Sequence, residues 1–237
     1  MTLRHSVFRS VFQPVRSDVF VQEATSRYFT NFSAAATSYV QLPSVINTGT
    51  GDFYTSVSIS PTGNNFYIFG YSLVSATTND RLLINSSNQL TGFGFTTNSL
   101  SNTAWITDGK LHLVECYRVS GIVYFDVDGV NLASVSDASA FIFDRVFGKY
   151  GGATLVDTFD GYGINASCSV SGVEILDMPL YESHISNLTA NNLVNPSNNG
   201  TYVNITSADA ELFTLNTSTS PSQWENSDKS IIIPVAY

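Results

Sequence analysis

The stretch 108–129 constrains the fold of this chain most strongly. It reads DGKLHLVECYRVSGIVYFDVDG: two apolar–polar alternating runs separated by Ser120-Gly121 and bounded by Asp-Gly at either end. Alternation with a period of two is typical of half-buried strands, and dipeptides with glycine suit tight hairpin turns because glycine adopts a positive φ at no steric cost. VNLASV follows the last Asp-Gly. The stretch therefore predicts a three-stranded antiparallel meander with one packed face.

The same rhythm of short strands and turns continues along the body of the chain. DFYTSVSIS alternates so that Phe53, Thr55, Val57 and Ile59 share one face, and Asn, Ser, Gly and Thr clusters bound the segments that follow. Hydrophobic residues make up 43% of the chain and charged residues only 12%. Such a composition favours strands and turns over surface helices. We predict an all-β antiparallel sandwich, with one short helix over residues 181–195.

The first thirty residues form a separate segment. Val-Phe or Val-Arg pairs recur there every four residues, and Pro14 interrupts any helix they could form. An isolated arm has no core in which to bury these side chains, so we expect a docking surface against the body or another subunit. We predict a docking arm over residues 1–30 and a sandwich domain over residues 31–237. The expected docking residues are Val7, Phe8, Val11, Phe12, Arg16 and Phe20.

Charge and hydropathy exclude several classes of partner. The net charge is −9, although the first thirty residues carry four arginines against two acids. An acidic body argues against a nucleic-acid partner, because a phosphate backbone needs a basic face. We find neither the apolar core of a signal peptide nor a run long enough to span a membrane, so we expect no export signal and no membrane partner.

Three stretches carry a resemblance to a known fold. DGKLHLVECYRVSGIVYFDVDGVNLAS, FGKYGG and FDGYG…VEILD resemble the strand and turn motifs of the concanavalin A-like/laminin G-like jelly rolls, over roughly residues 36–195. The sequence departs from that pattern between Gly161 and Val173, where it has extra residues. The resemblance implies a jelly-roll sandwich, and it places His112 on the core-facing side as a hydrogen-bonded structural histidine.

The arm carries a second resemblance. LRHSVFRSVFQPVRSDVF is similar to the N-termini of tailed-bacteriophage virion proteins, which often include a concanavalin A-like module. This analogy implies a virion structural protein, assembled in the host cytoplasm, whose partners are other virion proteins and copies of itself.

The sequence contains no recognisable catalytic constellation. Glycosidases need two carboxylates that flank the scissile bond. Glu174 and Asp177 are the nearest pair, but three residues along a strand should place them on opposite faces. There is no Gly-x-Ser-x-Gly motif, and the three histidines are dispersed. We therefore predict a protein that is not an enzyme, and we keep a glycoside hydrolase with an unfamiliar site as an alternative.

Calcium is the only cofactor that the sequence suggests. Asp144, Asp157 and Asp160 lie in expected loops that the fold would bring toward one end, and loop carboxylates are ligands that calcium prefers. The spacing matches no fixed calcium-binding motif. The simpler interpretation is that these aspartates cap turns, so we expect no bound cofactor unless calcium occupies this end.

A sugar-binding surface is the second candidate site. Glu115 and Tyr117 on one predicted strand, and Tyr124 and Asp126 on the next, should point outward from the sheet. Aromatic platforms beside hydrogen-bonding groups suit a glycan. They suit a subunit contact or a second layer of chain equally well. A carbohydrate-binding module that recognises host-surface glycans is therefore the main alternative to a purely structural virion role.

The cysteines and tryptophans have simpler interpretations. We expect Cys116 and Cys168 in strands as buried free thiols, while a disulfide between them stays open. Trp105 and Trp224 are expected as core or interface anchors.

Overall fold

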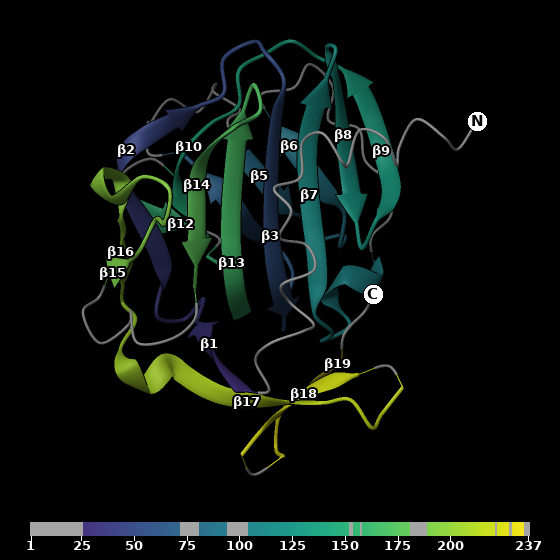
Figure 1. Ribbon diagram of the computed structural model, residues 1–237, viewed down its shortest axis with the longest axis vertical. Coiled ribbons are helices and arrows are strands. Elements are labelled where there is room, and N and C mark those ends of the chain that lie inside the picture. Colours follow the sequence, from purple (N-terminus) through teal and green to yellow (C-terminus); the bar gives the residue numbers. More distant parts are fainter. Residues whose placement is uncertain are drawn as a thin grey trace.

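A computed structural model describes residues 26–71, 81–93, 104–151, 154–156, 158–180, 189–220, 222–227 and 229–234. In this part of the chain the protein is a sandwich of two antiparallel sheets (Figure 1). The remaining regular structure there consists of one separate pair of short strands and of single 3-10 turns at Ala104–Thr107, Pro196–Asn198 and Ser207–Asp209. Among these residues, none belongs to a helix that is long and apolar enough to cross a membrane. The predicted all-β antiparallel sandwich is confirmed.

The larger sheet has ten strands, in the order β19-β18-β17-β1-β13-β3-β7-β8-β9 with β14 paired to β13. Their bounds are β1 Ser26–Phe32, β3 Phe53–Pro61, β7 His112–Val119, β8 Ile122–Val127, β9 Val130–Ser136, β13 Gly161–Val170, β14 Val173–Pro179, β17 Ala210–Asn216, β18 Gln223–Asn226 and β19 Ile232–Pro234.

The smaller sheet has seven strands, in the order β15-β16-β2-β10-β4-β5-β6, and β11 and β12 form a separate pair. Their bounds are β2 Tyr39–Asn47, β4 Phe66–Gly70, β5 Arg81–Ile84, β6 Leu90–Phe93, β10 Ile142–Val146, β11 Lys149–Gly151, β12 Thr154–Val156, β15 Thr189–Ala190 and β16 Gly200–Val203.

The main core fills the space between the two sheets. Its members are largely aromatic and β-branched, such as Phe69 and Phe143, whose ring centroids lie 4.6 Å apart. Strand β3 shows how the sequence builds it. Phe53, Val57 and Ile59 point into the core as predicted, because they alternate along a strand that is paired on both edges.

The meander predicted over residues 108–135 is confirmed as β7, β8 and β9. Ser120-Gly121 and Asp128-Gly129 join the strands, and all four residues have positive φ, as in the hairpin turns whose twist matches that of the strands. Asp108-Gly109 behaves differently. Gly109 has positive φ, but the dipeptide forms a bend between the 3-10 turn and β7 and does not join two strands.

The extra residues after Gly161 form the centre of the larger sheet. Strand β13 pairs with β3 along one edge, and its other edge is shared by β1 near Gly161 and by β14 near Val170. Most of these residues therefore belong to one long strand, Gly161–Val170.

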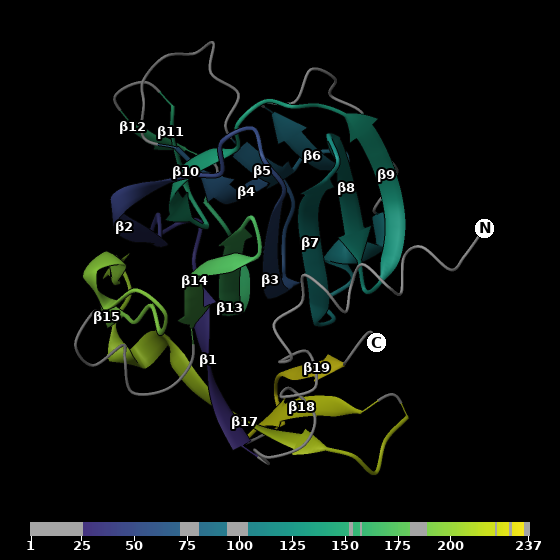
Figure 2. The ribbon, with the colours of Figure 1, turned by 45° about the horizontal axis from the view of Figure 1, so that its top comes forward.

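Strands β17–β19 curl beneath the sandwich (Figures 1 and 2). Their side chains contribute to a second, smaller core. The amide N–H of Leu111 donates to the carbonyl oxygen of Pro234 at 2.9 Å, which ties β19 to the start of β7. The second core contains Phe29, Leu111, Tyr162, Ile164, Phe213, Trp224 and Ile233. The expectation that Trp224 is a core anchor is confirmed; the Trp105 side chain lies outside the described residues.

The structure differs from two predictions, namely where the sandwich begins and where a helix forms. Strand β1 begins at Ser26, within the predicted arm, and the docking residues from Val7 to Phe20 lie outside the described residues. Residues 181–188 lie outside them as well. Residues 189–195 form β15 and turns, so the predicted helix is wrong over this part. The Asn192 amide oxygen accepts from the backbone N–H groups of Asp177 and Asn195, and such side-chain bonds compete with helical ones.

The two cysteines are buried free thiols, as expected. Cys116 and Cys168 both lie opposite Thr55, on the two strands that flank β3. Their Cα atoms are therefore separated by two strand spacings, or about 10 Å, which exceeds the reach of a disulfide of about 7 Å. Burial raises the pKa of both thiols.

Candidate functional site

The outer face of the larger sheet carries two rows of polar and aromatic side chains. Residues directly opposite one another on antiparallel strands share a face, so the strand register defines each row. The carboxylate row contains Asp177, Ser167, Ser56, Glu115, Asp126 and Asn131, and the tyrosine row contains Glu174, Ser169, Tyr54, Tyr117, Tyr124 and Ser134.

The tyrosine row includes a stack of rings. Tyr117 and Tyr124 lie with centroids 5.1 Å apart and planes 15° apart, and Tyr54 lies 6.1 Å from Tyr117 on the other side. Tyr117 and Tyr124 are half-buried, whereas Tyr54 is buried. The structure thus brings together the two tyrosines that the sequence singled out and adds a third. The alternation in DFYTSVSIS could have identified Tyr54, since it faces away from the core residues beside it.

Glu115 and Asp126 share the outer face, as predicted, and lie directly opposite each other on β7 and β8, but both are buried. The Tyr54 hydroxyl donates to Glu115 Oε1 at 2.6 Å, and the Tyr117 hydroxyl donates to Asp126 Oδ2 at 2.9 Å. The Asn131 amide donates to Asp126 Oδ1 at 2.7 Å. Like charges placed opposite each other destabilise a sheet unless donors compensate them. The carboxylates therefore act by holding the tyrosine hydroxyls in position.

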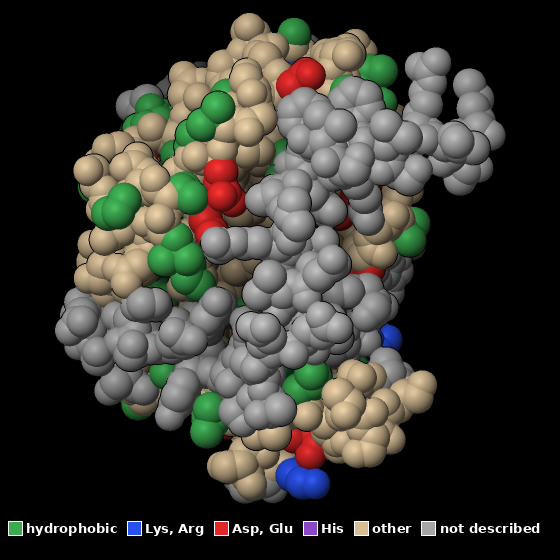
Figure 3. Space-filling model, viewed as in Figure 1, with side chains coloured by type: hydrophobic (Ala, Val, Ile, Leu, Met, Phe, Trp, Pro, Cys, Tyr) green, Lys and Arg blue, Asp and Glu red, His purple; other side chains and the backbone are tan. Residues whose placement is uncertain are grey.

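Asp177 and Glu174 share the outer face, which corrects the prediction that they point to opposite faces. They pair with Ser167 and Ser169, which are two residues apart on β13. The register shifts at this point because β14 has an extra residue, Ile175, and a bulge of this kind cancels one step of the alternation. Figure 3 shows acidic side chains gathered on this face over β13 and β14.

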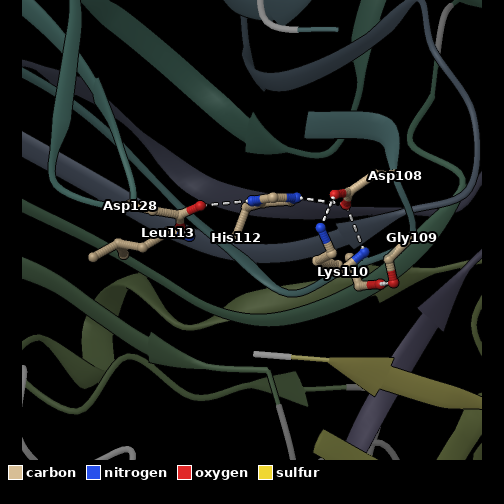
Figure 4. A network of polar contacts seen from close by, with 7 residues as sticks. Asp108, Gly109, Lys110, His112, Leu113 and Asp128 are labelled. Atoms are coloured by element: carbon tan, nitrogen blue, oxygen red, sulfur yellow. Dashed lines mark hydrogen bonds and ion pairs between the residues drawn. The ribbon is translucent and has the colours of Figure 1, made fainter. Parts of the chain in front are cut away.

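His112 is buried on the core-facing side of β7 and links the bend before β7 to the turn between β8 and β9 (Figure 4). Its Nδ1 lies 2.7 Å from Asp128 Oδ2 and its Nε2 lies 2.9 Å from Asp108 Oδ1. Lys110 contacts the same Asp108 carboxylate at 2.6 Å. Burial alone would lower the pKa of His112, but the hydrogen bonds to Asp128 and Asp108 outweigh it and raise that pKa. The predicted structural role of His112 is confirmed.

The three predicted calcium ligands are not seen as one cluster. Asp144 lies on strand β10 and not in a loop, where its Oδ1 accepts from Arg145 at 2.9 Å. Asp160 caps a turn by accepting from the Ala34 N–H and the Thr62 hydroxyl. Asp157 lies outside the described residues. Within the described ranges, no three His, Cys, Asp or Glu side chains are grouped so that they could hold a metal ion.

The fold defines the class: a sandwich of two antiparallel β-sheets. No family model and no curated protein matches the chain. It is similar to the structure of a candidate carbohydrate-binding protein from Bacteroides ovatus, with a TM-score of 0.51, 15% identity and coverage of 81% of this chain and 60% of that chain. Domains LG4-5 of the mouse laminin alpha1 chain align with a TM-score of 0.41 and 15% identity, covering 62% of this chain and 42% of that one.

At these identities the likeness concerns the fold alone. The chain spans about three-fifths of the length of the Bacteroides protein. The site residues of this chain therefore have to be assigned from its own side chains.

Proposed function

We propose that this protein is a non-enzymatic adhesion module that binds glycans through the tyrosine row. The observation that carries the proposal is the near-parallel stack of Tyr117 and Tyr124 on the outer face of the larger sheet. Aromatic rings offer an apolar platform to the C–H faces of a sugar, and stiff rings lose little conformational entropy on binding. The bond from the Tyr117 hydroxyl to Asp126 fixes one ring before any ligand arrives.

A glycan array tests this function. Tyr124→Ala should weaken binding about tenfold, because it removes one aromatic contact of up to about 1.5 kcal/mol. Tyr124→Phe keeps the ring and should retain most of the affinity. If the intact protein binds no glycan, or if both variants bind as the unchanged protein does, the tyrosine row is not a sugar site.

We propose further that the module belongs to a bacteriophage particle, as capsid decoration, a head fibre or a tail-associated adhesin. The observation that favours this setting is the basic, Val-Phe-repeating sequence of the first residues ahead of an acidic body. Deletion of residues 1–25 removes that segment and leaves β1 intact. The shortened protein should fail to enter particles. Incorporation at full occupancy would show that this segment is not the anchor.

A glycoside hydrolase stays as the alternative because Glu174 and Asp177 share a face. Same-face neighbours along a strand lie about 7 Å apart at their Cα atoms, a spacing at which two carboxylates could act on one sugar ring. Degradation of polysaccharides by the purified chain, lost in Glu174→Gln and in Asp177→Asn, would favour this activity over simple binding.

A further inference from the structure

We propose that strand β9 pairs edge to edge with β9 of a second copy, which joins two larger sheets into one. Strand β9 is the last strand of its sheet, and its partner among the described residues is β8 (Figures 1 and 2). An edge strand presents a row of backbone N–H and C=O groups that can pair with another chain. The partner proposed here is a second copy of this protein, because the side chains of β9 alternate in a way that lets the strand pair with itself.

The sequence of β9 lacks the usual protection of an edge strand. Its seven residues, VNLASVS, include no charged residue and no proline. The protective feature that it does have is a bulge at Leu132, between the pairs that Asn131 and Ala133 make with β8. The bulge lies in the first half of the strand, so residues 133–136 keep regular pairing with β8 and an open edge of four residues.

Apolar side chains on β9 are only partly covered. Leu132, Ala133 and Val135 are half-buried and pack against the margin of the main core, and Val130 is 56% exposed. A second sandwich continuing past β9 would cover these side chains in both copies, which removes apolar surface from water. This hydrophobic contribution adds to the backbone hydrogen bonds of the new strand pair.

The alternation of β9 favours one register of self-pairing. Ala133 and Val135 face the core side, whereas Ser134 and Ser136 face outward, as their partners on β8 do. A two-fold axis through Ser134 sets Ala133 opposite Val135 on the core side and Ser134 opposite Ser134 on the outer side. This register keeps residues 133–135 on their own faces, and it brings no charged side chains of β9 together.

The joined sheet has a consequence that rests on the proposed function. Ser134 belongs to the tyrosine row, next to Tyr124. In the proposed pair the row of one copy runs through the two serines into the row of the other, on the same face of the sheet. The two Tyr124 rings would lie three strand spacings apart, or about 14 Å. Such a surface suits an extended glycan and would add avidity to two weak sites.

Cysteine cross-linking of the full chain tests the register. Directly opposite residues of an antiparallel pair have Cα atoms about 4.5–5.5 Å apart, within disulfide range. Ser134→Cys should therefore form a disulfide-linked dimer under mild oxidation. Ser136→Cys is the matched control, because it is equally exposed but would lie about 14 Å from its equivalent. Cys116 and Cys168 are buried and should not react.

Charge exchange tests the interface by sedimentation velocity, without any glycan. The unchanged protein should be a dimer. Ser134→Lys and Ser134→Glu should each weaken the dimer at least tenfold through like-charge repulsion, and an equimolar mixture of the two should form a heterodimer. A monomeric unchanged protein would overturn the proposal. A dimer that Ser134→Lys leaves intact would overturn it as well. The same holds if that dimer is instead lost on deletion of residues 1–25. Glycan binding by a monomeric variant would leave the proposed function standing.

Discussion

His112 is a titratable residue whose environment differs strongly from that of an exposed side chain. It is buried, yet both ring nitrogens face carboxylates, which favours the doubly protonated imidazolium. The groups that surround it are Asp128 in the turn after β8 and Asp108, which is itself contacted by Lys110. The raised pKa therefore means that folding stabilises the charged form of this histidine.

Thermal stability should consequently fall as pH rises. The unfolded chain has a histidine pKa of about 6.5, so the stabilisation by His112 is complete below that pH and is lost as pH rises through the higher folded pKa. The melting temperature measured from pH 6 to pH 9 should decline over this window. His112→Gln should flatten the profile as well as lower it. A profile that declines equally in both proteins would assign the effect to other groups.

At the scale of elements, the sequence predicts strands and turns where side-chain alternation is regular. The strands β7 and β8 of the meander and the inward face of β3 were predictable because each obeys a strict period of two and is bounded by glycine-containing turns. The outer face was harder to predict. The bulge at Ile175 puts Glu174 and Asp177 on one face, and nothing in VEILD marks the extra residue. Long-range hydrogen bonds could not be predicted from the sequence either. One example is the buried Arg118 guanidinium, which donates to the carbonyl oxygens of Gly49 and Ser139.

Gly161 shows why β13 can begin where it does. Its φ is +138°, and a Cβ built there would lie 2.3 Å from the carbonyl oxygen of Ser60 on the neighbouring strand. Gly161→Ala should therefore lower the free energy of unfolding by at least about 2 kcal/mol, through backbone strain and overpacking together. Gly172→Ala is the matched control in the turn after β13. Gly172 also has positive φ, but nothing lies within 4 Å of its built Cβ.

Chemical denaturation of the two variants checks this prediction. The control should lose only about 1 kcal/mol, since its cost comes from the backbone conformation alone. Equal losses in the two variants would show that the contact with Ser60 relaxes at little cost and that the start of β13 is less constrained than its geometry indicates.

At the scale of the whole molecule, two cores share strands. The second core lies under β17–β19, but Phe29 on β1 and Tyr162 on β13 belong to it, while neighbouring residues of the same strands, such as Phe32 and Ala166, belong to the main core. A strand that is fixed on both faces cannot unfold in one core and persist in the other. We therefore predict that the described part of the chain unfolds in one cooperative transition.

Truncation of one large side chain in each core tests this cooperativity. Phe213 stacks on Phe29 at 4.8 Å in the second core, and Phe143 lies 4.6 Å from Phe69 in the main core. Phe213→Ala and Phe143→Ala should each cost about 3–5 kcal/mol, and each should shift a single transition seen alike by far-ultraviolet circular dichroism and calorimetry. A separate early transition in Phe213→Ala alone would show instead that β17–β19 and their core unfold as an independent unit, in which case the closure through Leu111 and Pro234 is too weak to couple the two cores.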